Sequence, residues 1–431
     1  MRVLITNSGE DQAYLMLRAL REHADRIVVA LDAGAALKRW GSMAAWSRYV
    51  DARHRVPDCS ADWRAGVIAP VNTQAEEAYI RRIEEICGLE DISHIVPSYD
   101  AEVYVLSKNR ERMARQGITA VVPAFDAVSR LIDKSLTLAA AERAGFPVPR
   151  TRVPADTESL REAAGDLEPP WVVKPRCNAH GKNIHLARNL AELEVIHAKL
   201  SRIQELPLVQ EYVPAATKRN FYVLASPDSE LVSIFSPRVH RLRKTGMSAP
   251  CAAVETTSDI PFEAEVRDLL REIGASGALT VQSIVDERDG KPKLMEINPR
   301  FGHNLWFRME LGMNEPLMLL RMWSGEAPGE FPPLREGVLL LDPLWDLMHL
   351  LGQSLDQSVS RLRSVFRGGR NDEHPLPKED LGELLRHLGK DYFGARPRIT
   401  NPLNRGYLKD PLPPLVRIAR VVLEALSRRA S

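Results

Sequence analysis

Four polar residues in the second half of the chain are spaced so that they can share one site. Glu296 and Asn298 lie two residues apart in a run rich in β-forming residues, so both side chains point to one face of a strand. Gln282 lies in a second such run, and Asp289-Gly290 between the two runs predicts a hairpin. Their oxygen atoms suit a hard cation such as magnesium, and the planar cation of Arg300 can reach phosphates bound beside it.

The length of the hairpin loop decides whether these side chains meet. We expect strands over Leu279–Val285 and Lys293–Ile297. A two-residue Asp-Gly loop places Gln282 and Glu296 on opposite faces of the hairpin. A three-residue loop, with Gly290 in the left-handed conformation, sets them directly opposite each other. We adopt the three-residue loop, because three oxygen-bearing side chains then converge on one patch.

The run Met295-Glu296-Ile297-Asn298-Pro299-Arg300 resembles the metal-binding strand of the ATP-grasp superfamily. Together with Gln282, it is most similar to the carbamoyl phosphate synthetase large-subunit branch. The resemblance implies ATP as the nucleotide, Mg²⁺ as the metal with Mn²⁺ as an alternative, and Arg300 as a catalytic residue. It also implies Gln282, Glu296 and Asn298 as metal ligands. An ordinary half-exposed hairpin is the alternative, and matches elsewhere in the chain argue against it.

Two lysines continue the resemblance. Lys134 precedes a helical run, Ser135–Ala144, which ends at Gly145 and two prolines, and it looks like the lysine that reaches the nucleotide phosphates from the larger lobe. Lys174 ends the apolar run Trp171–Lys174 and resembles the phosphate-binding lysine of the lid. The loop that follows, 178–184, contains one glycine and Lys182, which either binds phosphate or is solvent-exposed. Biotin-carboxylase-like members have more glycines there, so that branch is disfavoured.

The strand that ends in Gln210-Glu211-Tyr212-Val213 resembles the hinge whose backbone holds the adenine edge in the superfamily. All four are therefore expected cofactor-binding residues, and so is Lys218. The relatives carry a glutamate after this lysine to hold the ribose hydroxyl groups. Arg219 stands there instead and cannot accept those hydrogen bonds, which puts the ribose contacts in doubt.

A dense basic segment, 240–246, follows the hinge. Arg241 and Arg243 are expected to clamp a phosphate or a substrate carboxylate, since the guanidinium group suits planar anions. A solvated charged surface is the alternative.

The chain is expected to be an α/β protein. Residues 1–120 read as strand, helix, strand and are predicted to form a Rossmann-like domain of the kind that precedes ATP-grasp domains. Asp100 and Glu102 follow a predicted strand, where they can serve as ligands or begin a helix, and we favour capping of the helix. Residues 121–330 are expected to be a two-lobed ATP-grasp domain with its lid lobe at about 148–211, and residues 331–431 a C-terminal extension of unassigned role.

Composition restricts the class of protein. At 431 residues, 44% hydrophobic and 27% charged, with a net charge of +1, the chain is typical of a globular protein with no overall attraction to nucleic acid or membrane. Four cysteines without a CxxC pair indicate neither a zinc site nor a disulfide scaffold. We find no signal peptide or membrane-spanning run and expect a cytoplasmic protein. A final amphipathic helix, Leu415–Arg429, is expected to pack on the domain or on a homodimer partner rather than on a membrane.

The resemblance implies an ATP-dependent ligase that joins a carboxylate to an amine or thiol through an acyl phosphate and releases ADP and phosphate. The expected partners are therefore small molecules, and the sequence names neither substrate. A single ATP-grasp unit argues against complete carbamoyl phosphate synthesis. Two alternatives remain open: a small-molecule kinase on the same fold, and a non-catalytic nucleotide-binding protein.

Overall fold

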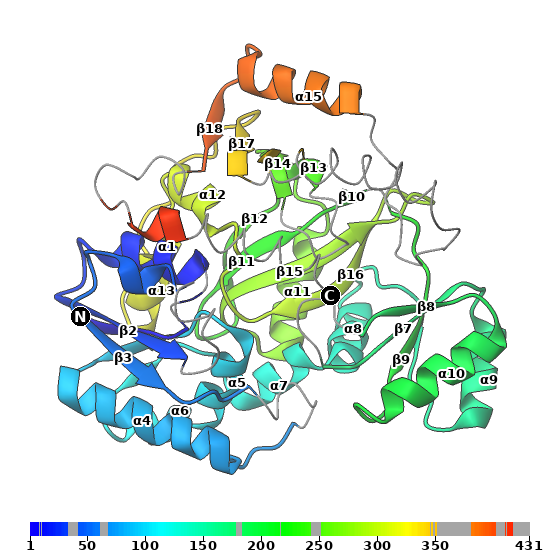
Figure 1. Ribbon diagram of the computed structural model, residues 1–431, viewed down its shortest axis with the longest axis horizontal. Coiled ribbons are helices and arrows are strands. Elements are labelled where there is room, and N and C mark those ends of the chain that lie inside the picture. Colours follow the sequence, from blue (N-terminus) through cyan, green and yellow to red (C-terminus); the bar gives the residue numbers. More distant parts are fainter. Residues whose placement is uncertain are drawn as a thin grey trace, which may run out of the picture.

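The computed structural model describes residues 1–7, 9, 11–32, 42–60, 68–177, 183–215, 217–242, 251–344, 346–347, 350, 381–401, 410 and 412–416. Figure 1 shows three regions: a sheet near the N-terminus, a central body and a smaller lobe at the opposite side. None of the helices within these ranges combines the length and the apolar character needed to cross a membrane.

The N-terminal region is a parallel sheet in the order β3-β2-β1-β4-β5, which is a Rossmann-like arrangement. Its strands are β1 (Arg2–Ile5), β2 (Arg26–Asp32), β3 (Ala52–Val56), β4 (His94–Val96) and β5 (Thr119–Ala120). Its helices are α1 (Asp11–Leu20), η1 (Ala44–Trp46), α4 (Gln74–Glu90), α5 (Asp100–Lys108) and α6 (Arg110–Ala114). The prediction of a Rossmann-like start is confirmed.

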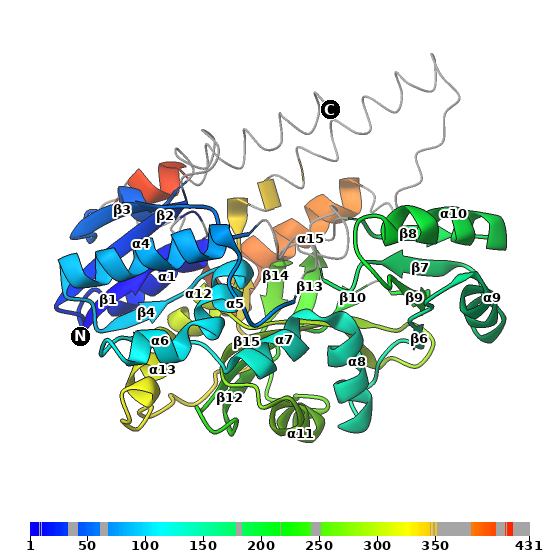
Figure 2. The ribbon, with the colours of Figure 1, turned by 90° about the horizontal axis from the view of Figure 1, so that it is seen from below.

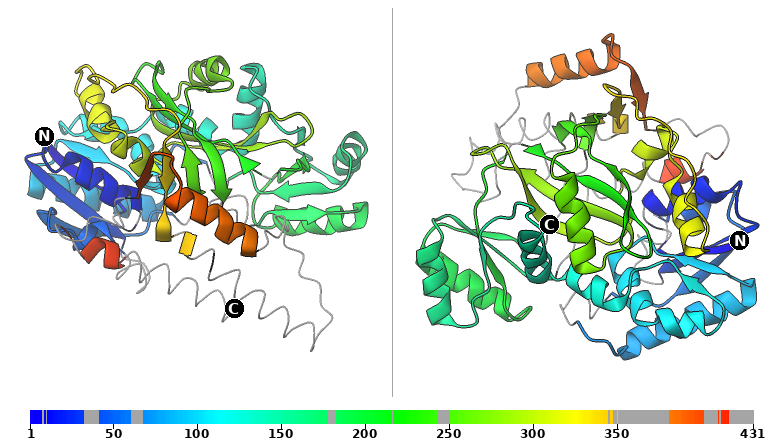
Figure 3. Two further views of the ribbon diagram at one scale, coloured as in Figure 1. Left: turned by 90° about the horizontal axis from the view of Figure 1, so that it is seen from above. Right: turned by 180° about the vertical axis from the view of Figure 1, so that it is seen from behind.

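Local sequence signals fix these helices. Thr73 and Glu76 form a reciprocal capping box at the start of α4, and Asp91 ends that helix in the left-handed conformation. The apolar residues of α4 and α5 pack with β1 and β4 into one core. On the other face, α1 packs against α12 (Leu305–Glu310) and α13 (Glu315–Trp323), as both views in Figure 3 show. A continuous core therefore joins the N-terminal sheet to the central body.

The central body is built on the sheet β10-β15-β11-β12, with β16 paired to the other edge of β15. Its strands are β10 (Thr217–Lys218), β11 (Phe221–Ala225), β12 (Leu231–Phe235), β15 (Gly277–Val285) and β16 (Pro292–Asn298). Three helices, α7 (Phe125–Ile132), α8 (Lys134–Arg143) and α11 (Glu263–Ile273), share a core with it. Both α7 and α8 pack against β16, which places the start of α8 beside the predicted metal ligands.

The smaller lobe occupies the segment predicted as the lid. Its antiparallel sheet runs β6-β9-β7-β8, and Figure 2 shows α9 and α10 beside it, away from the N-terminal sheet. The elements are β6 (Thr151–Arg152), α9 (Thr157–Asp166), β7 (Trp171–Lys174), β8 (His185–Ala187), α10 (Leu190–Ser201) and β9 (Leu208–Glu211). This lobe has its own small core, so it can move as a unit.

A fourth sheet joins the C-terminal region to the central body. It runs β13-β14-β17-β18, from β13 (Arg238–Leu242) and β14 (Cys251–Glu255) to β17 (Leu339–Leu341) and β18 (Arg398–Thr400). The described helix α15 (Leu381–Phe393) precedes β18. All of β17 is buried, and its residues pack in the cores of the central body and of this sheet.

Candidate active site

The hairpin β15–β16 brings the predicted metal ligands together, but its loop differs in length from the predicted loop. Asp286 N donates to Lys291 O (3.0 Å), so four residues, 287–290, form the loop. Gly290 has the expected left-handed backbone, with φ 70°. A four-residue loop alone would put Gln282 and Glu296 on opposite faces.

A β-bulge restores the expected register. Ser283 pairs with Leu294, but Gln282 pairs with Glu296, so Met295 is the additional residue. Beyond the bulge, Thr280 pairs with Asn298. The prediction that Gln282 lies opposite Glu296 is confirmed, whereas the three-residue loop is wrong. The bulge, rather than the turn, turns the three oxygen-bearing side chains to one face.

Lys134 meets Glu296 at the start of α8. Asp133 caps this helix by accepting a hydrogen bond from Ser135 N (2.9 Å), which leaves Lys134 in the first turn. Lys134 Nζ lies 3.3 Å from Glu296 Oε2, whose side chain keeps 28% of its surface exposed. A cation from the larger lobe therefore already lies beside the one carboxylate of the predicted metal set.

Lys174 approaches from the lid. It ends β7, is 1% exposed, and donates from Nζ to Gln210 Oε1 at 2.9 Å. Gln210 in turn donates from Nε2 to Thr151 Oγ1 (2.7 Å). Sequence reasoning assigned Gln210 to the adenine hinge and missed that its side chain orients the lid lysine.

The charges of this cluster shift one another's pKa values. Burial lowers the pKa of Lys174 to about 7, and the nearby charge of Lys134 adds to the lowering while Glu296 opposes it. Burial by itself would raise the pKa of the Glu296 carboxyl group. The positive charges of Lys134 and Lys174 outweigh burial and hold that pKa below its usual value. Glu296 is thus ionised at neutral pH.

The residues present fit a hard cation. Gln282, Glu296 and Asn298 offer oxygen atoms only, and the ion pair with Lys134 shows that Glu296 faces positive charge. Within the described ranges, no three His, Cys, Asp or Glu side chains are grouped to hold a metal ion. A metal here would have one carboxylate ligand and would need phosphate oxygens to complete its coordination.

Arg300 follows β16 and joins this cluster to the N-terminal domain. Its Nε donates to Asp100 Oδ2 at 3.0 Å, and its NH2 group lies 3.5 Å from Asn298 Oδ1. Asp100 stands in the first turn of α5, but no side chain caps this helix. Glu102 accepts a hydrogen bond from Thr6 Oγ1 (2.6 Å). Both acids therefore lie in the first turn of α5, where their negative charge favours the helix start as predicted, although no side chain caps the helix through a hydrogen bond.

The hinge strand β9 is tied to its neighbours through Glu211. Its Oε1 accepts a hydrogen bond from Arg150 N (2.9 Å), and its Oε2 lies 3.3 Å from the guanidinium group of Arg288 at the hairpin tip. Val213 is buried and Tyr212 partly exposed, as a backbone hinge requires. The Glu211 side chain has these structural partners, so any contact with adenine would come from the backbone.

Lys218 and Arg219, which follow the hinge strand β9, were the subject of two further predictions. Lys218 is buried on β10, paired with Ile284 of β15. Arg219 donates from Nε to Ser236 Oγ (2.8 Å) and from NH2 to Asp259 O. Arg219 thus has hydrogen-bond partners within the central body, and the expectation that it does not hold the ribose stays a prediction.

Arg241, which was predicted to bind a phosphate or a substrate carboxylate, binds two carboxylates of the protein instead. It is buried, its Nε and NH2 groups donate to Asp346 (2.7 and 2.8 Å), and its NH1 group donates to Asp391. Both carboxylates belong to the C-terminal region, so the clamp role is wrong for Arg241 in this conformation. Arg243 and Lys182 lie outside the described residues, as does most of the predicted final helix, and their roles stay predictions.

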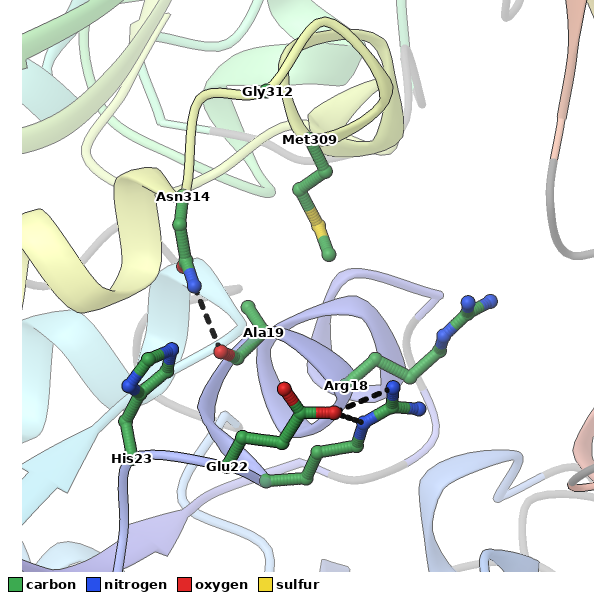
Figure 4. A pocket seen from close by; sticks show the side chains of 8 residues that line it. Arg18, Ala19, Glu22, His23, Met309, Gly312 and Asn314 are labelled. Atoms are coloured by element: carbon green, nitrogen blue, oxygen red, sulfur yellow. Dashed lines mark hydrogen bonds and ion pairs between the residues drawn. The ribbon is translucent and has the colours of Figure 1, made fainter. Parts of the chain in front are cut away.

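A separate cavity of about 200 Å³ lies between α1 and the α12–α13 connection (Figure 4). Asn314 Nδ2 donates to Ala19 O across it (2.9 Å), and Arg21 pairs with Glu22 (3.0 Å). None of the predicted site residues lines it. It is a gap between two packed helical elements and does not belong to the cluster around Glu296.

Comparison with known families defines the class. The family model described as an ATP-grasp domain matches residues 131–303, which include Lys134, Lys174, Glu296 and Arg300. Residues 131–303 are therefore similar to an ATP-grasp domain, in agreement with the prediction from the hairpin and the lid.

Comparison with curated proteins narrows the relationship. The large chain of carbamoyl phosphate synthase from Methanothrix thermoacetophila is 24% identical over 294 residues, which are 62% of this chain and 27% of that protein. The same enzyme's large chain from Vibrio cholerae is 24% identical over 314 residues, covering 65% of this chain and 28% of the relative. The chain thus spans little more than a quarter of the length of these relatives.

Solved structures share the fold. An ADP complex of N5-carboxyaminoimidazole ribonucleotide synthetase has a TM-score of 0.59 at 17% identity, covering 91% of this chain and 96% of that one. The biotin carboxylase domain of 2-oxoglutarate carboxylase from Hydrogenobacter thermophilus, with MgADP and bicarbonate, has a TM-score of 0.57 at 18% identity, covering 76% and 70%. At these identities the likeness establishes the fold alone.

Proposed function

We propose that this protein is an ATP-dependent ligase that joins a carboxylate to an amine or thiol through an acyl phosphate. The observation that carries the proposal is the ion pair between Lys134 and Glu296, with Lys174, which is hydrogen-bonded to Gln210, near enough to both to interact electrostatically. Cations from the two lobes thereby meet at the carboxylate of an oxygen-only ligand set. Such a set suits a triphosphate with its metal.

The chemistry follows from the weakness of a carboxylate as an electrophile. A carboxylate oxygen attacks the γ-phosphorus, the bond from that phosphorus to the β-phosphate oxygen breaks, and ADP leaves. The amine or thiol then attacks the acyl carbon, loses a proton, and phosphate leaves. A magnesium ion, when bound, would neutralise charge between the two anions.

This chain's own residues would divide the work. Gln282, Glu296 and Asn298 would hold the ion. Lys134 and Lys174 would bind the phosphates from the two lobes, and Arg300 would contact the transferred group with its planar fork. The backbone of Tyr212 and Val213 would hold the adenine edge.

The relatives support this class and differ in their substrates. One neighbour's structure contains MgADP and bicarbonate, and another is a phosphoribosylglycinamide synthetase from Anaerococcus prevotii (TM-score 0.53, 15% identity). We propose small-molecule substrates for this chain too, in the cytoplasm where ATP is available. A homodimer is part of the proposal, because one neighbour is described as a domain dimer.

Release of ADP tests the proposal against its two alternatives. Purified protein with MgATP is offered pooled carboxylates that lack amines and thiols, pooled amines that lack carboxylates, and thiols that lack carboxylates, singly and in pairs. A ligase releases ADP only when a carboxylate and an acceptor are present together. A kinase needs one cosubstrate, and a binding protein releases none with any pool, so either result would reject the ligase. The Glu296→Gln variant is the blank.

A further inference from the structure

One buried ion pair connects the N-terminal domain to the predicted active site. Asp100 Oδ2 accepts a hydrogen bond from Arg300 Nε at 3.0 Å, and the two side chains are 6% and 12% exposed. The partners lie 200 residues apart in the sequence. Asp100 follows β4, at the carboxyl end of the parallel strands, where open sheets commonly contribute to ligand sites.

The pair sets the orientation of the Arg300 guanidinium group. Asp100 takes the Nε edge, and NH1 donates to Phe301 O (3.2 Å). NH2 then lies toward Asn298 Oδ1, at 3.5 Å. Because guanidinium is planar, contacts at Nε and NH1 fix the plane of the whole group. The NH2 contact directs the guanidinium group toward Asn298, a predicted metal ligand.

One of the two carboxylate oxygen atoms of Asp100 takes no part in the hydrogen bonding of the fold. Its Oδ1 atom is buried and has no hydrogen-bond partner. Acids that serve packing alone normally have both oxygen atoms satisfied, since an unpaired buried acceptor is costly. Its neighbour Glu102 is equally buried, at 4% exposure each, yet its contact is to Thr6 of the N-terminal domain.

We propose that Asp100 is a positioning residue of the active site, which holds the Arg300 guanidinium group against the terminal phosphate of the bound nucleotide. The N-terminal domain then contributes to phosphate recognition through this one side chain. The inference rests on the proposed function, because it requires a nucleotide at the Glu296 cluster. A displacement of about 1 Å at a reacting group can cost about a hundredfold in rate, so orientation alone is enough to matter.

Nucleotide binding in the presence of Mg²⁺ tests the proposal without knowledge of the substrates. Isothermal titration compares ADP with a non-hydrolysable ATP analogue that retains the γ-phosphate. Asp100→Asn is expected to weaken binding of the analogue about tenfold, because Arg300 loses its charged partner, and to change ADP binding less than about twofold. Arg300→Gln should show the same pattern, and the double variant should be no weaker than Arg300→Gln alone.

Control variants distinguish a loss of Arg300 positioning from a loss of protein stability. Glu102→Gln lies on the same helix turn with equal burial, and we expect it to leave the analogue-to-ADP ratio unchanged. Asp100→Glu keeps the charge and should recover part of the ratio. If Asp100→Asn melts below the assay temperature, Asp100→Glu and Arg300→Lys give the same comparison in folded protein.

Two results would overturn the inference. In the first, Asp100→Asn leaves the analogue-to-ADP ratio of the wild type unchanged. In the second, its effect adds to that of Arg300→Gln in the double variant. Either would leave the proposed function standing, since the wild type still binds nucleotide. If the wild-type protein binds neither nucleotide, the proposed function fails and the inference fails with it.

Discussion

Two clusters of charged side chains in this protein differ in whether their charges are balanced. Around Glu296, the cations Lys134, Lys174 and Arg300 face two carboxylates, Glu296 and Asp100. Around Arg241, two carboxylates surround one cation, and the Tyr392 hydroxyl group donates a hydrogen bond to Asp346 (2.8 Å). The first set has cationic charge left for an anion. The second is complete without any ligand.

This difference explains why one basic residue is a site candidate and another is not. Burial alone would lower the pKa of Arg241, but Asp346 and Asp391 raise it above its usual value, so the charge is permanent and already matched. Burial lowers the pKa of Lys174, Lys134 adds to the lowering, and the negative charge of Glu296 is not enough to offset them. A buried cation that lacks a carboxylate partner indicates a place for an anionic ligand.

The largest expected effect comes from the carboxylate of the first cluster. Glu296→Gln replaces the ionised metal ligand by a neutral amide, so turnover should fall by about 10³-fold or more. Melting temperature and nucleotide binding without metal should change little, because the amide keeps the size of the side chain. ADP release at saturating Mg²⁺ is the measurement. Near-normal release would show that Glu296 is not a metal ligand.

The second cluster should affect stability instead of activity. Arg241→Met leaves Asp346 and Asp391 without their buried partner, and the free energy of unfolding should drop by about 3–5 kcal/mol. Binding of MgATP to the folded protein should stay within about twofold. Denaturant unfolding measures the loss.

The exposed pair Arg152–Asp166 (3.1 Å) is the matched control for Arg241. Arg152→Met should cost at most about 1 kcal/mol, because an exposed ion pair contributes little. If Arg241→Met unfolds like wild type but loses turnover, Arg241 belongs to the active site after all.

The sequence predicted those parts of the fold whose geometry depends on a short run of neighbouring residues. The strands of the hairpin and the helix after Lys134 follow from local patterns, and they lie where the patterns put them. The bulge at Met295 has no such signal, since it depends on pairing between strands. The same holds for Asp100, whose partner is 200 residues away, and for Arg241, whose partners come from the C-terminal region. Neighbouring basic residues cannot be assigned to a binding site or to a structural ion pair from sequence alone, because that depends on acidic partners far away in the chain.

Lys134 allows a finer test of the first cluster. In the nucleotide-free protein its ammonium group lies where it competes with a metal for Glu296 (3.3 Å). Lys134→Met should therefore bind Mn²⁺ alone several-fold more tightly than wild type, while MgATP binding weakens by about tenfold. Electron paramagnetic resonance of free Mn²⁺ gives the metal affinity.

A lysine of the β15–β16 hairpin, Lys293, is the control for Lys134 of α8. Lys293 pairs with Asp289 at 3.2 Å near the turn, away from the predicted metal ligands. Lys293→Met should leave both the metal and the nucleotide affinities unchanged. Equal metal affinity in wild type and Lys134→Met would mean that the ion pair does not occupy the metal position.

The smallest effect we expect is a proton taken up when nucleotide binds. With a pKa of about 7 in the nucleotide-free protein, Lys174 is largely neutral at pH 8. Phosphates favour the charged form and raise that pKa, so binding of MgATP at pH 8 should take up a fraction of a proton, and much less at pH 6, where Lys174 is already charged. Titration calorimetry in two buffers of different ionisation enthalpy measures the uptake, and Lys174→Met should abolish it.

The same shift has a consequence for stability. An unfolded chain holds this lysine at its ordinary pKa, about 10.4. Between about pH 7 and pH 10 the unfolded state therefore binds more protons than the folded state, and the free energy of unfolding contributed by Lys174 rises with pH across that window. Lys174→Met should remove this slope, and the wild-type slope should also vanish with saturating MgATP, which charges the lysine in the folded state. A slope that survives the substitution would mean that another group, and not the lid lysine, carries the mismatch of charge.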